Sequence, residues 1–560
     1  MTNGVLRRIA HVRESGENGL ALVMVLCVTM VLTLATVAGA SYALRQLQQV
    51  GRDQNWSAAL AAAQAGVDDY VSKLNRDSTY WMYGAASNYS GTSTFIGSGG
   101  NTAFSNWTAM PNGTAVRGYF RYDINNSLYN QRGIIKIRST GKVGSSTRTV
   151  EAQLRRGSFI DFLYFTDLET QDPALYSPSS TWKCDQYFYA GRSSSCTNIQ
   201  FAPGDVIDGP AHSNDAMLMC VGTGTGVPAG TYGPWFTGKV TTNYTPTSGT
   251  NRWRRATASG CDTNTSRIPL FSVAPPAGPV KLDMPPSNSA LKSETNPALT
   301  APNPTGCLYT GPTSITMRAD GKLDIVSPLT KSPHPVTGCA KGTGVSLPPN
   351  GVIYVRNAPA TADTYGTAGP STCPTDNGLG YPIANDYMAV YSCKAGDAFV
   401  QGTLDGRLTI AAENNVVVVE DTRYAYRVDS TRAQDDILGL IATNDVQVYH
   451  PVSKSGTSTY TNLANTQTAN LKLDAAILSV QHSFRVQNYQ YGASLGTLYV
   501  FGAIAQKYRG IVGQNGSTGF LKAYVYDKRL QWDSPPKFLN PIQSAFSPTQ
   551  WSELTPAYSG

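Results

Sequence analysis

The sequence predicts a mainly β protein that carries one long N-terminal α-helix. Residues 19–44 contain no charged side chain, and a helical pattern continues from there to residue 77. Through the remaining chain, short apolar stretches alternate with Gly, Asn and Asp. With 53 Gly, 33 Pro and 14% charged residues among 560, the composition is more typical of extracellular β proteins than of helical cytosolic enzymes.

The uncharged stretch 19–44 is longer than the roughly 20 residues that cross a bilayer as a helix, and longer than the about 7–15 apolar residues of a signal peptide. Arg7, Arg8 and Arg13 precede it. Because cationic flanks stay in the cytoplasm, we expect a single-pass chain whose N-terminus is cytoplasmic and whose remainder lies outside. A rival interpretation is an export signal cut at the small residues 38–40.

The helical pattern does not stop at the small residues, which argues against an export signal. An apolar stripe at helical spacing follows, and no Pro interrupts residues 16–77. The stripe consists of Trp56, Leu60, Ala63, Val67, Tyr70, Val71 and Leu74. We therefore predict one continuous helix over residues 19–77, lipid-soluble in its first half and amphipathic in its second. A simple membrane anchor needs no such amphipathic second half.

Two N-terminal segments, GLALVMVL and AALAAAQAGVDDYVSKLNRDSTYW, resemble the PilX-type N-terminal domain of type IV pilus assembly proteins from high-GC Gram-positive bacteria. FIDFLYFTDLETQDPALY, GDVIDGPAHSND and FGAIAQKYRGIVG are similar to later segments of that group. The resemblance implies a minor pilin whose partners are other pilins, the assembly platform, the prepilin peptidase and, before assembly, the cytoplasmic membrane. The expected filament-core residues are Leu22, Val25, Leu26, Met30, Leu32 and Leu34.

The prepilin cleavage site departs from the pattern of this family. A cut after Gly16 would leave Glu17 as the first residue, and a cut after Gly19 would leave Leu20. Neither cut places the usual Glu at the fifth mature position. Because that Glu neutralises the N-terminal amine of a neighbour in an apolar core, its absence predicts a subunit at low copy or at the tip rather than the repeating one.

We expect a cytoplasmic leader at residues 1–18, followed by the helix at 19–77. Residues 78–160 are then expected to form a small β head. Segment 133–156 has the alternation of a β-hairpin, with Ile135 and Ile137 on one strand and Val150 and Ala152 on the other. GKVGSS supplies the turn. Since two strands alone are marginal in water, we expect this hairpin to pack on the amphipathic half of the helix.

Beyond residue 160, short apolar strands with Asn and Asp at their ends predict an irregular parallel β-solenoid over 161–270 and 396–535, with a β-sandwich as the alternative. GPAHSNDAMLM and GLIATNDVQVY echo each other within it. Residues 271–395 are a Pro- and Cys-rich insertion, and 536–560 a Pro-rich tail. The expected corner residues are Gly209, Asn214, Asp215, Gly439, Asn444 and Asp445.

Nine cysteines include Cys27 in the apolar run, where a free thiol packs as a small hydrophobe. The other eight contain no CxxC pair and have no His at zinc spacing, so no metal site is expected. An even number in an exported region predicts about four disulfides. Of the many possible pairings, we favour neighbours along the chain: Cys184–Cys196, Cys220–Cys261, Cys307–Cys339 and Cys373–Cys393.

The best candidate for an active site is the group Asp205, Asp208, His212 and Asp215, since carboxylates with a His can hydrolyse a glycoside. The echo at residue 442 replaces the His with Ala, so a structural corner is the favoured interpretation. No P-loop or G-x-G-x-x-G motif is present. We expect no enzyme and no cofactor.

A second acidic group comprises Asp161, Asp167, Glu169 and Asp172. Carboxylates at this density can bind Ca²⁺, but the strict loop pattern is missing. A solvated linker between the head and the solenoid is the favoured interpretation.

Together these features predict a minor pilin or pilus assembly protein that initiates assembly, presents an adhesive extracellular domain, or does both. The surface ligand is unknown, with a glycan as one candidate, because 31 Tyr beside Ser, Gly and Asn favour polar adhesion. The sparse basic residues indicate no nucleic-acid partner. The alternatives are a secreted or membrane-anchored carbohydrate-binding or hydrolysing solenoid, and an anchored surface protein that never enters a filament.

Overall fold

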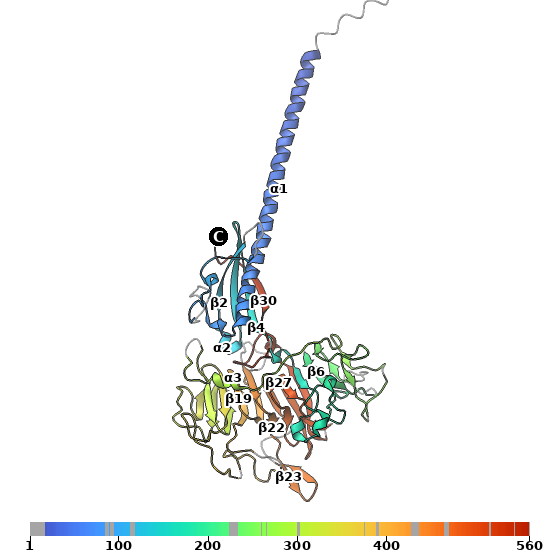
Figure 1. The fold of residues 1–560 in the computed structure, drawn as a ribbon, viewed down its shortest axis with the longest axis vertical. Helices are drawn as coiled ribbons and strands as arrows, with labels where there is room; N and C mark the ends of the chain where they lie inside the picture. Colours follow the sequence, from blue (N-terminus) through green and yellow to red (C-terminus); the bar gives the residue numbers. More distant parts are fainter. Residues whose placement is uncertain are drawn as a thin grey trace, which may run out of the picture.

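The computed structural model comprises a protruding helix, a small antiparallel head and a large parallel β domain (Figure 1). The residues that it describes are 17–84, 89, 95–111, 118–222, 233–258, 260–264, 266–299, 303–374, 376–387, 391–426, 436–463, 470–514, 517–542 and 544–558.

Helix α1 (Glu17–Arg76) is continuous, as the uninterrupted helical pattern predicts. Its first half extends away from the rest of the molecule, and its second half lies along the head (Figure 1). On the predicted stripe, Ala63, Val67, Tyr70 and Leu74 are buried, whereas Trp56 is half exposed. The stripe therefore gives the packing face of the helix, starting one or two turns later than the pattern suggests.

The head is a five-stranded antiparallel sheet in the order β1-β2-β3-β4-β30. The predicted hairpin is present as β3 and β4, and its inward residues Ile135, Ile137, Val150, Ala152 and Leu154 join the helix in one core. The strands are β1 (Thr108–Ala109), β2 (Gly118–Asn125), β3 (Ile135–Val143), β4 (Ser146–Arg156) and β30 (Phe546–Leu554).

The C-terminal segment differs from its prediction. Residues 536–560 were expected to be an extended Pro-rich tail, but Phe546–Leu554 forms the edge strand β30, antiparallel to β4. Pro548 is accommodated because the strand lies at the sheet edge and the register shifts beside it. The head is therefore built from both ends of the chain, and the β domain is inserted between them.

The helix approaches the head sheet closely at Gly141 of β3. A Cβ atom there would lie 2.1 Å from the carbonyl oxygen of Ala59 and 2.3 Å from the amide nitrogen of Ala63, both backbone atoms of α1. A backbone cannot move aside as a flexible side chain can. Glycine at this position is thus required for the helix to pack on the sheet.

We expect Gly141→Ala to destabilise the head by about 1–3 kcal/mol, because one methyl group overpacks the helix–sheet contact. Gly157→Ala is the matched control, since a Cβ at Gly157 would meet nothing within 4 Å. Thermal unfolding of the two variants measures the difference. Equal midpoints for the two variants would show that the close approach does not constrain the head.

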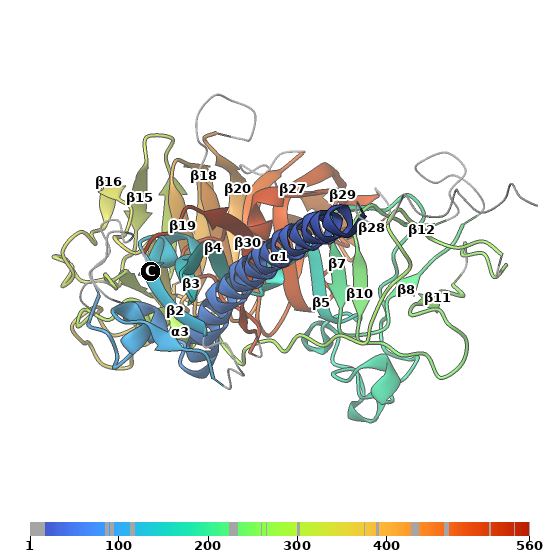
Figure 2. The same ribbon diagram turned by 90° about the horizontal axis from the view of Figure 1, so that it is seen from above.

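In the β domain, each coil of the chain forms a rung whose strands pair in parallel with those of the next rung, so that the strands fall into three stacks. Figure 2 shows strands of this domain lying side by side. Stack I has like residues above one another, including the buried column Ile353, Ile410, Leu440, Ile477 and Ile504. Its strands, in spatial order, are β13 (Cys307–Thr310), β17 (Val352–Arg356), β19 (Arg407–Ala412), β21 (Ile437–Ala442), β25 (Lys472–Ser479), β27 (Ser494–Tyr508), β5 (Tyr164–Leu168), β7 (Ala211–Ser213) and β10 (Val240–Thr242).

Stack II consists of β14 (Thr313–Met317), β18 (Ala398–Leu404), β20 (Val416–Tyr424), β22 (Val446–Val448) and β26 (Phe484–Val486). Stack III joins the ends of β18, β20, β25 and β27 to β29 (Thr518–Tyr526), β6 (Val206–Asp208), β9 (Trp235–Phe236) and β12 (Leu270–Phe271). This is parallel stacking, as an irregular solenoid requires, and a β-sandwich would instead face two antiparallel sheets.

The remaining strands and helices of the molecule are short. The remaining strands are β8 (Leu218–Met219), β11 (Arg254–Arg255), β15 (Lys322–Val326), β16 (Gly342–Ser346), β23 (Val452–Ser455), β24 (Thr459–Asn462) and β28 (Gly513–Gln514). The short helices are α2 (Tyr129–Arg132), α3 (Ser289–Ser293), η1 (Tyr80–Met82), η2 (Thr102–Phe104), η3 (Phe159–Asp161), η4 (Pro173–Leu175), η5 (Ser180–Trp182), η6 (Phe188–Ala190) and η7 (Lys528–Gln531).

The order of rungs in space is not the order in sequence. Strand β5, the first of the domain, lies inside stack I, third from one end, next to β27 near the end of the chain. The chain builds β7 and β10 outward from β5, crosses to β13 at the far end, and returns rung by rung to β27. The last rung thereby closes against the first.

The Pro-rich segment is the crossover between the two ends. It passes Asn214, whose side-chain amide exchanges two hydrogen bonds with the backbone of Leu282 at 2.7 and 2.9 Å. Further along, the Asn288 amide donates to the Ala412 carbonyl at 2.6 Å. The predicted insertion 271–395 therefore ends early, because 307–356 supplies strands of stacks I and II.

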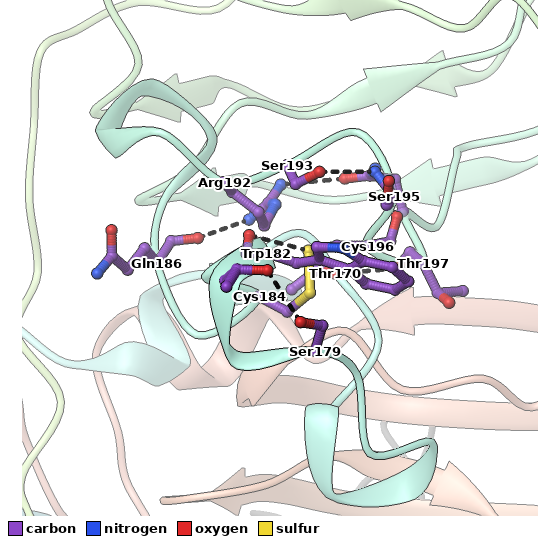
Figure 3. The surroundings of a disulfide bond; sticks show 12 residues. Thr170, Ser179, Trp182, Cys184, Gln186, Arg192, Ser193, Ser195, Cys196 and Thr197 are labelled. Carbon is purple, nitrogen blue, oxygen red and sulfur yellow. Dashed lines mark hydrogen bonds between the residues drawn. A yellow bond between two sulfur atoms is a disulfide. The ribbon is translucent and has the colours of Figure 1, made fainter.

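The eight cysteines of the β domain pair as neighbours along the chain, which confirms the predicted pattern. Figure 3 shows the first bridge beside Arg192, in a loop that projects from the stacks. The four disulfides are Cys184–Cys196, Cys220–Cys261, Cys307–Cys339 and Cys373–Cys393. Cys27 is free and exposed.

Candidate functional site

The apolar half of α1 is the first candidate site. Among the helices described, α1 from Leu20 onward has the length and hydropathy to cross a membrane. The predicted filament-core residues are 57–65% exposed, far more than an aqueous protein usually leaves in one patch. They are Leu22, Val25, Leu26, Met30, Leu32 and Leu34. Of the cleavage candidates, Glu17, Gly19 and Leu20 lie in the first turn of α1, and Gly16 lies outside the described residues.

The Thr and Ser hydroxyl groups in this half are satisfied within the helix. Thr29, Thr33, Thr36 and Ser41 each donate a hydrogen bond to a carbonyl three or four residues earlier, at 2.7–2.9 Å. A polar group without a partner is costly in an apolar medium. These side chains therefore suit the helix to lipid or to a packed helical core.

The four residues of the predicted active site each form hydrogen bonds or ion pairs with different residues and not with one another. Asp205 accepts from the amide of Ala202 at 2.8 Å, and Asp208 accepts from the hydroxyl of Thr237 at 2.8 Å. Asp215 forms a buried ion pair with Arg192. The arrangement thus fixes loops and rungs and does not align two carboxylates with the His.

His212 of β7 is buried in the stack. Its Nδ1 lies 2.7 Å from Thr241 Oγ1 and its Nε2 lies 3.0 Å from Asn214 Oδ1, while its ring stacks on Phe165. Burial lowers its pKa from 6.5 to about 4. The imidazole is therefore neutral in the folded protein at pH values where the unfolded chain already binds a proton.

This shift predicts acid sensitivity. Between pH 6.5 and 4 the unfolded state binds more protons at His212, so its stabilising contribution is complete above pH 6.5 and is lost as the pH falls toward 4. The loss amounts to about 3 kcal/mol at 1.36 kcal/mol per pKa unit. His212→Gln should lack this component, which urea unfolding at pH 7 and pH 4.5 measures. The same acid loss in both proteins would contradict it.

The second acidic group also differs from its prediction. A solvated linker was expected, yet Glu169 and Asp172 are buried. Glu169 pairs with Arg509 at 3.0 Å, Asp172 with His482, and Asp161 with Arg155 at 2.6 Å. Within the described ranges, no three His, Cys, Asp or Glu side chains are placed to hold a metal ion.

The predicted corner residues do occupy rung ends, with one exception. Asn214 and Asp215 follow β7, and Asn444 and Asp445 join β21 to β22, where Asn444 bonds Asn414 of the neighbouring rung. Gly209 lies in the turn before β7.

Gly439 instead lies inside β21. A Cβ there would be 3.0 Å from Phe538 and from Pro535, so the glycine makes room for the C-terminal segment that covers this face of stack I. The alternation of the segment alone could not distinguish that role from a corner.

Sequence reasoning missed a groove on the outer face of stack II, with a volume of about 420 Å³. Six amide side chains contribute to its lining: Gln171, Asn415, Gln447, Gln487, Asn488 and Gln490. The only sequence signal is a Gln placed between two buried Val residues in β22, which marks an outward polar position. The residues that join it come from distant rungs.

No model of a known protein family matches this chain, and no curated protein matches its sequence. A solved structure to which it is similar is the competence-associated pilin ComZ from Thermus thermophilus, at 12% identity and a TM-score of 0.24, over 89% of this chain and 96% of that one.

Proposed function

We propose that this chain is a minor pilin of a type IV pilus-like filament, of the PilX type, present at low copy or at the tip. The single observation that carries the proposal is the contrast along α1. One half is an exposed apolar rod, and the other half is buried under an antiparallel head. A rod of this kind leaves water only by entering a membrane or by packing against other such helices.

The position of the β domain supports low copy. It lies at the end of the head away from the free half of α1, so a helix bundled in a filament would carry the domain outside (Figure 1). A domain this large cannot repeat along a thin filament without collision. The lack of a Glu at the fifth mature position points the same way.

The head and the β domain are coupled through Asp533. Its carboxylate binds Arg407 of β19 at 2.6 Å and Arg132 of α2 at 3.1 Å. Two chain crossings and this shared ion pair support a rigid display of the β domain on the filament. We propose a display and assembly role without catalysis, with other pilins and the assembly platform as partners.

Shearing filaments from cells tests this function. The chain should co-purify with sheared filaments at a small fraction of the major subunit and should disappear from them when the prepilin peptidase is deleted. Recovery in the membrane fraction alone, with none in the filaments, would contradict the filament role and favour a surface anchor. Recovery as a free soluble protein would favour the secreted alternative.

A further inference from the structure

On the outer face of stack II, side chains in register on successive strands form a column. The groove lies where this outer column changes from apolar to polar residues. Phe399 of β18 and Val417 of β20 are covered by the rings of Tyr381 and Tyr391 and by their neighbours. The next residue of the same column is Gln447, which pairs in register with Val417. The covering loop thus ends where the outward side chains become hydrogen-bonding groups.

The floor of the groove is held in place. The Tyr391 hydroxyl donates to Gln487 Oε1 at 2.8 Å and accepts from Gln447 Nε2 at 3.2 Å. Gln447 and Gln487 are only 5% and 6% exposed. Asn488 adopts a left-handed backbone with φ of 53° while its amide donates to the His450 carbonyl at 2.9 Å. Buried amides fixed in this way are pre-organised for a partner.

Gln447 lines the groove and donates its amide to Tyr391, and among the described residues no hydrogen bond to its Oε1 is formed. Arg485, the next residue of the column, uses its Nε to bind Asp445 at 2.8 Å. That pair cancels its own charge, and the other lining residues of the groove are uncharged.

A neutral, polyhydroxylated ligand fits these groups. Amides offer a donor and an acceptor side by side, which suits adjacent hydroxyls, and the half-buried Tyr489 adds an aromatic side chain, a group that can pack on C–H groups. An added peptide strand is disfavoured, because β22 is already paired with β20 and β26 on both sides. We propose that the groove binds a neutral oligosaccharide. This deepens the proposed function and depends on it only in placing the β domain outside the cell.

Binding to immobilised sugars tests the inference with the full chain in detergent. The probes are the neutral malto-, cello-, manno- and N-acetylchito-hexaoses, with an oligogalacturonate and a Gly/Ser-rich peptide as comparators. We expect at least one neutral hexaose to bind and the two comparators to bind at least tenfold more weakly. Failure of all four hexaoses, or preferred binding of the peptide or the acidic sugar, would overturn the inference.

Variants locate the binding in the groove. Gln447→Leu and Gln490→Ala should each weaken binding of that hexaose at least tenfold, and the exposed position of Gln490 keeps the test valid if the Gln447 variant fails to fold. The controls are Gln401→Ala and Tyr499→Ala, on β18 and β27 outside the groove. Equal binding by groove and control variants would overturn the assignment. A groove variant that loses sugar but still enters filaments separates this inference from the proposed function.

Discussion

Replacing Arg509 with Met should destabilise the β domain by about 3–5 kcal/mol, because it leaves a buried carboxylate without its counter-charge. The Arg509 and Glu169 side chains are 4% and 0% exposed, and Nη1 lies 3.0 Å from Oε2. The guanidinium also lies 3.7 Å from the centre of the Phe201 ring. This residue joins the chain after β27 to the residues after β5, and so it closes the last rung against the first.

Urea unfolding followed by Trp fluorescence, with the disulfides intact, measures this loss. Arg318→Met is the matched control, since Arg318 and Asp320 form an exposed pair, and it should leave the unfolding midpoint unchanged. Adding Glu169→Gln to Arg509→Met should recover much of the loss, because it removes the unpaired charge. An Arg509→Met protein as stable as the Arg318→Met protein would show that rung closure does not depend on this pair.

Placing a Lys at Leu32 should remove the chain from membranes and filaments. Leu32 lies near the middle of the apolar half of α1 and is exposed. A cation at the centre of a membrane helix costs about 2.5–3.5 kcal/mol, or about a hundredfold in the insertion equilibrium. In an aqueous setting the same change would be harmless, because exposed Lys is well solvated. Loss of the variant from membranes and filaments would therefore show that the helix lies in apolar surroundings, whereas no change would show that it lies in water.

Fractionation of cells into membrane, filament and soluble pools gives the readout. Gln48→Lys serves as the control, on the same helix beyond the apolar stretch, and it should distribute as the unmodified chain does. If Leu32→Lys and Gln48→Lys distribute alike, the apolar half of α1 does not contact lipid or other apolar helices.

The features that the sequence predicts well are local ones. The helix, the β3–β4 hairpin and the four disulfides each depend on residues within a few dozen positions of one another. The edge strand β30 does not, because its partner Leu154 is nearly 400 positions from Pro548 and the Pro disguises the alternation. Strands β5 and β27 pair with each other although they are also far apart in the sequence.

The groove was hidden for the same reason. Val417, Gln447 and Arg485 form one outer column only because three rungs stack in register. The sequence shows each as a single polar or apolar residue in a short strand. The sequence favours a solvated position for acids such as Glu169, because their counter-charge, Arg509, lies at the other end of the domain's chain.

The mature N-terminus of the surface protein tests the central claim most directly, by mass spectrometry with and without the prepilin peptidase. The account predicts a terminus at Glu17 or Leu20 that is lost in the peptidase mutant, because α1 then enters filaments as a processed helix. A terminus at Ser41 in both strains would contradict it, since the apolar half would be a discarded export signal. An uncut chain in both strains would also contradict it and leave a membrane anchor.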